Sequence, residues 1–509
     1  IKQATKIALG SGDWSNPSIW SNNIIPNEND VVKIPAGINI NLDNEGVCYS
    51  LGIRGNLSVS GQLSVGTIMV FEEGELRLED GANITIRDIP LYYGLFSNDS
   101  QYISNSDPIT GCDDYGQYHR GIIILGTFVA SGTSPSHNID ARFVGRSSNN
   151  IVLSESPTDW NVGDRLVFPN IEGRLNNKTP HIATIVNISD TVITIDSLPS
   201  WELYSPAYDD KNNIKEYPWV FNLTEDKWSI CIRSENSVNR GHVMFTGNCK
   251  VDISGVAFVD LGRTDANVFN DDPIINMSGV PVGRYITRSG SIGKQEVGVR
   301  PQNVRGRYPI HGHHVYGSYT ESLSWVIENC LIWTSPKVGI TIHDSHYGIC
   351  VGNYIYNARG CGILTEQGNE YANVIHDNTV IYCPGSGEAI YSRTSQSEFD
   401  PLGDIGHSGD GYWCRSISSS YKGNLAFNVR RTGHVFTQIS SPDLLNIPKV
   451  GSYDKIENLN TKEHRFEALE LYSVGCDEAV LVQEVGCRMD NRSLPNGIKE
   501  ISPSHIRHL

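Results

Sequence analysis

The sequence predicts an all-β protein that contains a long parallel β-helix. Short runs of Val, Ile, Leu and Phe alternate with polar residues, and Gly, Asn, Asp or Ser separate these runs, which is typical of strands and turns. No long stretch of the sequence has helical periodicity. A repeat between about residues 325 and 435 predicts that many of the strands stack as a β-helix.

The repeat consists of two series of short strands. The first series starts at Asn329, Asn353, Asn378 and Asn424, so its steps are 24, 25 and 46 residues, the last being close to two turns. The second series runs in phase with it, over residues 338–342, 361–365, 387–391 and 433–437. Two short strands in a repeat of this length are typical of one β-helix coil. We expect the asparagines to form an internal ladder, each bonding the backbone of the next coil.

The bulk properties of the 509-residue chain exclude some classes of function. The formal net charge of −17 argues against broad nucleic-acid binding. No apolar run approaches the length of a membrane span. The length is sufficient for a large core and for more than one structural unit. Any acidic polymer that binds this chain must therefore meet a local basic patch.

Eleven cysteines favour an oxidising compartment. Four pairs are close enough in sequence to be candidate disulfides: Cys231 with Cys249, Cys330 with Cys350, Cys361 with Cys383, and Cys476 with Cys487. The odd total leaves at least one thiol free or paired elsewhere. Asn56, Asn83, Asn177 and Asn222 each begin a triplet that permits glycosylation.

The stretch Arg305-Gly306-Arg307-Tyr308-Pro309-Ile310-His311-Gly312-His313-His314 contains two arginines, a tyrosine and three histidines. Alternate side chains of a strand point to the same face. His311 and His313 therefore form an imidazole clamp suited to a metal ion or an anionic substrate, while His314 is expected to point the opposite way. The alternative is a surface turn that happens to hold histidines.

A basic segment precedes the histidines. It contains Arg284, Arg288, Lys294, Arg300, Arg305 and Arg307, with Glu296 as the one acid between them. In so acidic a chain this is a local reversal of charge. We expect a basic loop over residues 264–304 that could grip an anionic polysaccharide beside the histidines. The alternative is a solvated, mobile loop.

Several motifs, taken in order, resemble a known family. Gly12-Asp13-Trp14, Pro26-Asn27-Glu28-Asn29-Asp30 and the glycines that follow look like a G8 domain, an all-β module named for its glycines. Further motifs follow at residues 159–167, 240–242, 260–263, 306–313, 342–344 and 366–373. Together they are similar to the cell-migration-inducing and hyaluronan-binding protein family, with its transmembrane relative and fibrocystin. The resemblance covers about residues 10–435.

The resemblance implies an extracellular protein with three parts. Residues 1–145 would form the G8 domain, and residues 146–440 a right-handed, single-stranded parallel β-helix like that of pectate lyases. Residues 441–509 would form a C-terminal β cap, which hides the last edge, or the start of a further domain. For its best-known members the family implies binding and endo-type depolymerisation of hyaluronan. The expected location is outside the cell, secreted or as the ectodomain of a surface protein.

The repeat predicts that residues from successive coils meet in one site. His343 lies about one coil after His313, and Glu366 follows 23 residues later. Equivalent positions on adjacent coils are about 4.8 Å apart. The candidate catalytic residues are His311, His313, His343, Glu366, Tyr308 and Glu370.

Two chemistries remain open at this site. His311, His313 and His343 could hold a divalent metal, either calcium or a transition metal, and no organic cofactor is expected. Without a metal, a histidine or glutamate would transfer a proton, Tyr308 would act as the acid, and Arg305 or Arg307 would hold a uronate carboxylate. Hydrolysis would use Glu366 with Glu370, whereas β-elimination needs a base and a group that neutralises charge.

The chain departs from its relatives near the site. Gly312 replaces an aromatic residue between the paired histidines, Cys361 replaces a histidine, and Gln367 replaces an aspartate. The segment from 264 to 304 is also longer than expected. These departures motivate an alternative hypothesis, in which the chain is a non-catalytic surface or adhesion module that binds glycan or protein.

Overall fold

The computed structural model describes residues 4–92, 102–103, 114, 117–135, 140–170, 179–201, 219–277, 281–286, 294–315, 325–366, 368, 370–387, 406–416, 418–437, 467–469, 471–483 and 505–507. Within these residues the helical elements are three single-turn 3₁₀ segments: η1 (Pro17–Ile19), η2 (Ser21–Asn23) and η3 (Glu225–Lys227). No helix in the described part of the chain is long and apolar enough to cross a membrane. The all-β prediction is confirmed.

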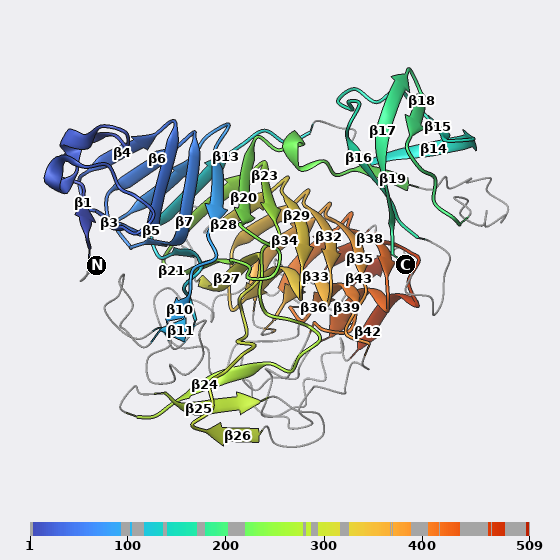
Figure 1. Cartoon of the computed structure of the whole chain (residues 1–509). Helices are drawn as coiled ribbons and strands as arrows, with labels where there is room; N and C mark the ends of the chain where they lie inside the picture. The colour runs from blue at the N-terminus through green and yellow to red at the C-terminus, as the bar shows by residue number, and fades with distance from the viewer. Residues whose placement is uncertain are drawn as a thin grey trace.

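Most strands form a parallel β-helix with three sheets (Figure 1). The chain visits the sheets in turn: β30 (Val338–His343), β31 (Gly348–Val351) and β32 (Tyr354–Ala358) make one coil, and β33 (Cys361–Thr365) then pairs in parallel with β30. A coil therefore has three strands, one more than the repeat predicted. The additional strand, represented by β31, is only four residues long.

The first sheet carries the predicted histidines and is called the site sheet. Its strands pair in parallel in the order β1 (Lys6–Ile7), β3 (Val31–Ile34), β5 (Glu45–Ile53), β7 (Gln62–Val70), β12 (Gly121–Ile124), β21 (Val243–Gly247), β27 (Ile310–Val315), β30, β33, β36 (Asp410–Cys414), β39 (Thr432–Thr437) and β42 (Glu478–Gln483).

The second sheet is called the ladder sheet. It begins with the first half of β7 and continues through β9 (Asn83–Ile86), β20 (Ile230–Ser234), β23 (Val256–Val259), β29 (Leu331–Ser335), β32, β35 (Thr379–Cys383), β38 (Leu425–Val429) and β41 (Tyr472–Val474). The two sheets join because the first half of β7 pairs with β9 and its second half pairs with β12.

The third sheet completes each coil. It is formed by β2 (Gly12–Asp13), β4 (Asn39–Leu42), β6 (Asn56–Val59), β8 (Glu75–Leu78), β13 (Thr127–Ser131), β22 (Lys250–Ser254), β28 (Trp325–Glu328), β31, β34 (Tyr371–His376), β37 (Ser418–Lys422), β40 (Glu467–Leu469) and β43 (His505–Arg507). The strands β40 to β43, from the predicted C-terminal part, continue the three sheets in parallel register.

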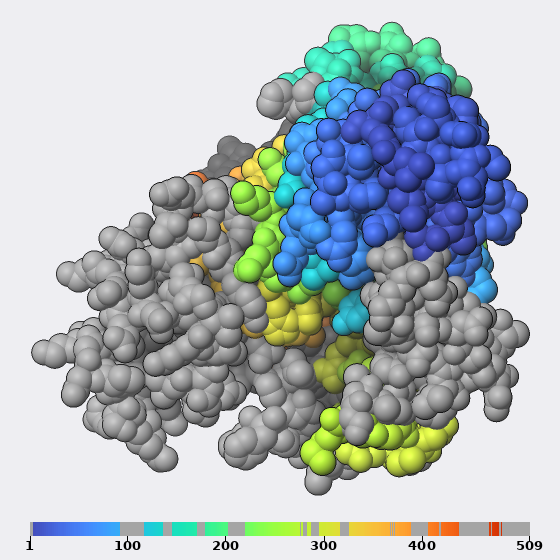
Figure 2. Space-filling model, turned by 90° about the vertical axis from the view of Figure 1, so that its left-hand side faces the viewer, coloured from blue at the N-terminus to red at the C-terminus, as the bar shows by residue number. Residues whose placement is uncertain are grey.

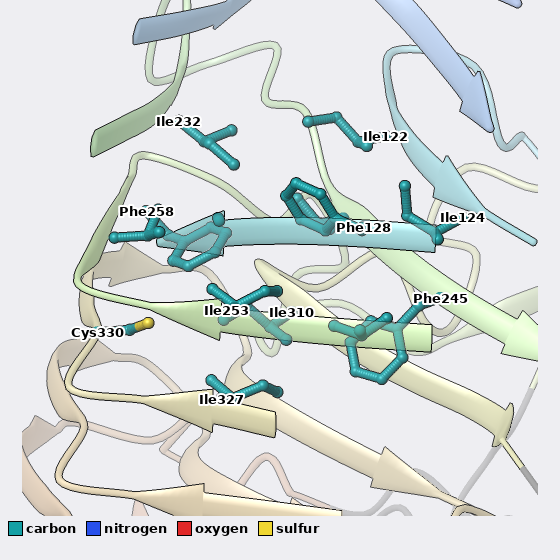
Figure 3. Packing of buried hydrophobic residues seen from close by; sticks show 14 of the residues in the cluster. Ile122, Ile124, Phe128, Ile232, Phe245, Ile253, Phe258, Ile310, Ile327 and Cys330 are labelled. Atoms are coloured by element: carbon teal, nitrogen blue, oxygen red, sulfur yellow. The ribbon is translucent and has the colours of Figure 1, made fainter. Parts of the chain in front are cut away.

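The interior of the β-helix is a continuous column of apolar side chains. Ile253 lies opposite Ile327 on adjacent coils, and Figure 3 shows both with Phe245 and Phe258 pointing into this column. Fully burying one such side chain stabilises the fold by about 1.5–3 kcal/mol. This stacking fixes the coil-to-coil register and so fixes which outward residues of the site sheet become neighbours.

The predicted asparagine ladder is present. The Oδ1 of Asn378 accepts the backbone N–H of Asn353, and the Oδ1 of Asn424 accepts that of Asn378. In the coil before, however, the sequence alignment was wrong by one residue. Cys330 occupies the ladder position, where its N–H donates to Asn353. Asn329 instead has a left-handed φ of 52°, at the turn position that Gly352 occupies one coil later with a φ of 67°.

The step of 46 residues is one coil with an insertion, so its interpretation as two turns was wrong. Thr379 of β35 lies directly opposite Leu425 of β38. On the site sheet, β36 pairs with β33 and takes the place predicted for residues 387–391. Residues 388–391 lie outside the described residues. The pattern misled because a Gly-rich segment within the insertion resembles the true strand.

A closed barrel of antiparallel strands is inserted between β13 and β20 (Figure 1). Its strands are β14 (Asp140–Ser147), β15 (Asn150–Leu153), β18 (Val192–Ile195), β17 (His181–Ser189), β16 (Arg165–Phe168) and β19 (Trp219–Asn222). The barrel packs on the ladder sheet, where the rings of Phe221 and Phe427 are 5.1 Å apart. Figure 2, which faces the N-terminal end, shows barrel residues above the first coils.

The predicted division at residue 145 falls inside β14 of the barrel. Strands from both sides of the barrel share sheets, because β13 pairs with β8 before it and with β22 after it. In the structure the strands of residues 1–145 therefore begin the β-helix as well as the barrel. The assignment of residues 1–145 to a G8 domain stays a prediction.

The predicted basic loop contains a small antiparallel sheet, which lies below the β-helix in Figure 1. Its strands are β24 (Asp271–Ile275), β25 (Pro281–Ile286) and β26 (Lys294–Val297). A separate parallel pair is formed by β10 (Leu91–Tyr92) and β11 (Tyr102–Ile103).

Three of the four candidate disulfides are absent from the described residues. Cys231, Cys249, Cys330, Cys350, Cys361 and Cys383 are free thiols. The predicted partners belong to different sides of the coil: β33 of the site sheet holds Cys361, for example, while β35 of the ladder sheet holds Cys383. The fourth pair includes Cys487, which lies outside the described residues. Most of these thiols are buried and serve as small apolar residues.

Candidate functional site

Three successive strands of the site sheet bring the predicted histidines and Glu366 together. His313 of β27 lies directly opposite His343 of β30, and their ring centres are 5.0 Å apart. Thr365 of β33 lies opposite Ile342, so Glu366 follows His343 on the next coil. The Nδ1 of His343 is 3.9 Å from the Oε2 of Glu366. The coil spacing thus places these residues as the sequence predicted.

His311 lies on the inner side of this cluster, and its side chain is buried at 2% exposure. Its Nδ1 is 2.8 Å from the carbonyl oxygen of Gly306. A carbonyl only accepts, so Nδ1 carries the hydrogen and Nε2 keeps the lone pair. Nε2 is buried and has no hydrogen-bond partner among the described residues. It is therefore available to a ligand.

Gly306 is required for this arrangement. Its φ is +78°, which favours glycine. A Cβ at this position would come within 2.8 Å of the Cε1 of His311. The glycine thus permits the close approach that fixes the His311 ring.

His314 also belongs to the cluster, although alternation predicted that it points away. Its φ is 54°, and it is an extra residue of β27, because the consecutive residues Thr246 and Gly247 of β21 pair with His313 and Val315. This bulge breaks the regular alternation. Its ring centre is 4.1 Å from that of His313 and 5.1 Å from that of His343. Its Nδ1 lies 2.6 Å from the Oδ2 of Asp344. Sequence reasoning missed His314 because a run of two histidines does not indicate a left-handed residue.

The imidazoles of His311 and His313 are held neutral. Burial lowers the pKa of His311 well below its usual value, and the nearby imidazoles of His313 and His343 lower it further. Burial, followed by His343 and His314, lowers the pKa of His313 to about 2. Burial favours the neutral form of Asp344, but the hydrogen bond with His314 and the nearby imidazole of His346 outweigh it and lower the pKa of its carboxyl. Neutral imidazoles offer lone pairs to a proton or a metal.

Two groups of side chains are close enough to hold a metal ion. His311, His343 and Glu366 form one group, and His313, His314 and His343 form the other; within each group the ligand atoms lie within 4.8 Å of one another. The two groups share His343. The predicted ligands His311, His313 and His343 are thus divided between them, and the predicted metal stays a prediction.

Tyr308 and Glu370 lie beside the cluster, but their contacts are those of residues that stabilise the fold. Tyr308 is buried at 2% exposure and packs with Val338 and Trp413; its ring centre is 5.4 Å from that of His311. The Oε1 of Glu370 accepts the backbone N–H of Asp344, and its Oε2 accepts that of Gly368. These bonds correspond to a carboxylate that shapes a turn.

The predicted substrate-binding arginines largely pair within the protein. Arg284 bonds Asp271 and Glu296. The Nε of Arg305 is 2.6 Å from the Oδ2 of Asp272. Burial opposes the charge of Arg305, but Asp272 and then Glu366 outweigh it and raise its pKa. Arg305 therefore lies beside the cluster as a permanent cation.

The remaining basic residues of the predicted patch are either buried or lie outside the described residues. Arg307 is buried, donates from Nε to the carbonyl of Gln117, and covers the ring of Tyr118 at 4.3 Å. Arg300 is 9% exposed. Lys294 begins β26, but its side chain lies outside the described residues, as does Arg288.

Two of the departures from the relatives fall in the core. Gly312 faces inward, and a Cβ there would be 2.9 Å from the ring of Phe245, which fills the space on the preceding coil. Cys361 is buried and packs with Tyr308 and Leu364. Neither substitution removes a group from the cluster. Gln367 lies outside the described residues.

Comparisons with known proteins support the resemblance seen in the sequence. Residues 289–475 match the CEMIP beta-helix family. Two Dictyostelium discoideum proteins are similar over most of this chain: protein rliB is 22% identical over 74% of it, and communication mutant protein F is 21% identical over 81%. Mouse fibrocystin-L is 28% identical over 25% of the chain. The chain spans 29% and 34% of the two Dictyostelium proteins and 3% of fibrocystin-L.

Solved structures give weaker matches. The tailspike gp61 of Pseudomonas phage phi297 is 10% identical over 79% of this chain and 55% of its own, with a TM-score of 0.17. The Gp54 tailspike of Acinetobacter baumannii bacteriophage AP22, solved with a capsular saccharide, is 9% identical over 84% and 64%, with a TM-score of 0.15. At these scores they add nothing to the strand pairing described above. Over residues 289–475 the β-helix of this chain is therefore similar to the CEMIP beta-helix family, and the low-identity matches to fibrocystin-L are consistent with this similarity.

Proposed function

We propose that this chain binds and cleaves a uronate-containing polysaccharide, hyaluronan or a related polymer, outside the cell. The observation that carries the proposal is the cluster of His311, His313, His343 and Glu366 on three successive coils. The cluster lies inside the segment that matches the CEMIP β-helix family, and the family resemblance supplies the substrate class. A stacked sheet also offers a long, rigid face to an extended polymer.

The cluster supports proton transfer rather than a pair of catalytic carboxylates. Both oxygens of Glu370 accept backbone N–H groups, so it is poorly placed to act with Glu366 as in two-carboxylate glycosidases. Glu366 lies beside the cation of Arg305 and is the candidate base of the cluster. The neutral His311 and His313 offer lone pairs next to it.

The cluster is suited to two reactions. In β-elimination, a base takes the proton at C5 of the uronate, the electron pair forms the C4–C5 double bond, and the C4–O bond breaks as the leaving oxygen gains a proton. In hydrolysis, a base takes a proton from a water that attacks the glycosidic carbon, the bond from that carbon to the leaving oxygen breaks, and the leaving oxygen gains a proton. The products differ, because only elimination leaves an unsaturated uronate.

The test is incubation of the purified chain with size-defined hyaluronan, and separately with neutral dextran as a control. Chain length is followed by size-exclusion chromatography, and unsaturated products by ultraviolet absorbance. His313→Ala should reduce cleavage of hyaluronan by at least about 100-fold, the contribution typical of a positioned acid or base. His181→Ala, on the distant barrel strand β17, should leave cleavage unchanged.

Intact hyaluronan in the presence and absence of divalent metals would overturn the proposal. Binding without cleavage, unaffected by His313→Ala, would instead support a non-catalytic surface or adhesion module, the alternative suggested by the sequence.

A further inference from the structure

We propose that His313, His314 and His343 hold a transition-metal ion of the zinc class, that Asp344 positions His314 for it, and that His311 and Glu366 remain beside the ion without binding it. This assignment rests on the proposed function for the role of the ion, because it deepens the same cluster. Its test needs no polysaccharide.

The arrangement of the three imidazole rings suits a metal ion. The three rings converge, with centres between 4.1 and 5.1 Å apart. Their ligand atoms lie within 4.8 Å of one another. Zinc binds imidazole nitrogen at about 2.0–2.1 Å, so ligand nitrogens in a tetrahedral site are roughly 3.3 Å apart. A closure of at most about 1.5 Å, which rotation of the side chains can supply, completes such a site.

The carboxylate of Asp344 lies behind His314 and orients its ring. Because the Oδ2 of Asp344 lies 2.6 Å from Nδ1, that nitrogen carries the hydrogen and Nε2 keeps its lone pair. Histidine ligands of metals commonly donate their other N–H to a carboxylate in this way, which fixes the ring and raises its basicity. The second oxygen of Asp344 is 3.5 Å from the Nε2 of His346. Asp344 is thereby held in place from two sides.

Backbone conformation brings the outer ligand into place. His314 has a φ of 54° and Asp344 a φ of 44°, in the left-handed region that histidine and aspartate enter more often than most other side chains. With a regular strand, His314 would point away from His313.

Exposure distinguishes the two ligand groups. The outer group, which contains His313 and His314, is more accessible than the inner group, because the side chain of His314 is 38% exposed whereas His311 is 2% exposed and the side chain of Glu366 is 6% exposed. This exposure leaves room for water or substrate at an open coordination position. Three imidazoles suit zinc, copper or nickel rather than calcium or magnesium, which prefer oxygen ligands. The inner group then supplies Glu366 and the free Nε2 of His311 next to the ion.

The experiment measures metal binding by the full chain. The protein is first stripped with a chelator, then titrated with Co²⁺, whose visible absorption reports tetrahedral nitrogen ligands, and with Zn²⁺ in competition. Wild-type protein should bind one ion per chain, with Zn²⁺ displacing Co²⁺ and a large excess of Ca²⁺ leaving the spectrum unchanged.

Variants assign the ligands. His314→Ala should abolish the Co²⁺ spectrum, and Asp344→Asn should weaken binding by about 10–100-fold, as expected for a carboxylate behind a ligand. Glu366→Gln should keep the spectrum and bind within about threefold of wild type, and the distant His181→Ala should be unchanged. Circular dichroism confirms that each variant is folded.

Absence of a bound ion in the wild-type protein overturns the proposal. Binding that survives His314→Ala but is lost in Glu366→Gln also overturns it, because the ion would then occupy the inner group. Metal binding without cleavage of hyaluronan leaves this site standing and removes the proposed function; cleavage by a wild-type protein that binds no ion in the titration does the reverse.

Discussion

Replacing Asn378 by alanine tests whether the buried asparagine ladder stabilises the β-helix. The Oδ1 of Asn378 accepts from the backbone N–H and the side-chain amide of Asn353, at 3.0 and 2.9 Å. Its Nδ2 donates to the carbonyl of Cys350 at 2.9 Å and to the Oδ1 of Asn424 at 3.1 Å. All of these groups are buried, so water cannot easily replace the lost partners.

The magnitude follows from which groups lose a partner. The side-chain amide of Asn353 still bonds the carbonyl of Ile327, and the Oδ1 of Asn424 still accepts the N–H of residue 378. The N–H of Asn353 and the carbonyl of Cys350 lose the bonds that Asn378 made to them. Leaving a buried polar group unsatisfied costs about 1–3 kcal/mol. Asn378→Ala should therefore lower the free energy of unfolding by about 2–6 kcal/mol.

The matched control is Asn39→Ala. Asn39 and Asn56 form the same kind of amide pair between adjacent coils, at 2.7 Å, but on the exposed face of the third sheet. Water can replace this bond, so the change should stay within about 0.5 kcal/mol. Urea unfolding followed by circular dichroism measures both variants. Equal effects for Asn378→Ala and Asn39→Ala would falsify the view that the buried ladder holds the coils together.

Three further predictions concern the site, the barrel and the thiols. Gly306→Ala should lower the free energy of unfolding by about 1–3 kcal/mol, because residue 306 has a left-handed φ. The change should also displace the ring of His311, so cleavage should fall sharply while the circular dichroism spectrum stays unchanged. Normal turnover would contradict this. Phe427→Ala should remove about 3–5 kcal/mol of packing between barrel and ladder sheet, seen as faster limited proteolysis around the barrel, and an unchanged digestion pattern would count against it. Unfolding in an alkylating reagent without reductant should label Cys330 and Cys350 fully, and a disulfide-linked peptide in the mass spectrum would show the assignment of free thiols to be wrong.

The sequence predicted those features that depend on regular repetition. A spacing of 24 to 25 residues between Asn329, Asn353 and Asn378 predicted the coil length, and the coil length correctly placed His343 and Glu366 one coil apart. The errors lie where repetition is interrupted. Cys330 replaces asparagine in the ladder, so the motif was aligned one residue early. An insertion doubled the apparent spacing before Asn424, since a spacing cannot distinguish two coils from one coil with a loop.

Two arginines of the predicted basic loop are paired with acids that the count along the sequence did not include. The count from Arg284 to Arg307 found one acid, Glu296, but Asp271 and Asp272 come earlier in the chain. Asp271 on β24 pairs with Arg284 on β25, and Asp272 on β24 pairs with Arg305, which lies between β26 and β27. A charge pattern along the sequence does not predict the field in space when strands pair in antiparallel register.

The most consequential difference is at His314, because it changes what the cluster can bind. With strict alternation, the site would have His311 and His313 on one face and would depend on Glu366 to complete a ligand set. The left-handed φ of His314 adds a third imidazole at the outer side, and Asp344 orients it. In the proposed metal site, Glu366 is then not needed as a ligand. A local break in strand geometry, which no spacing predicts, thus supplies the third proposed ligand from the chain's own backbone.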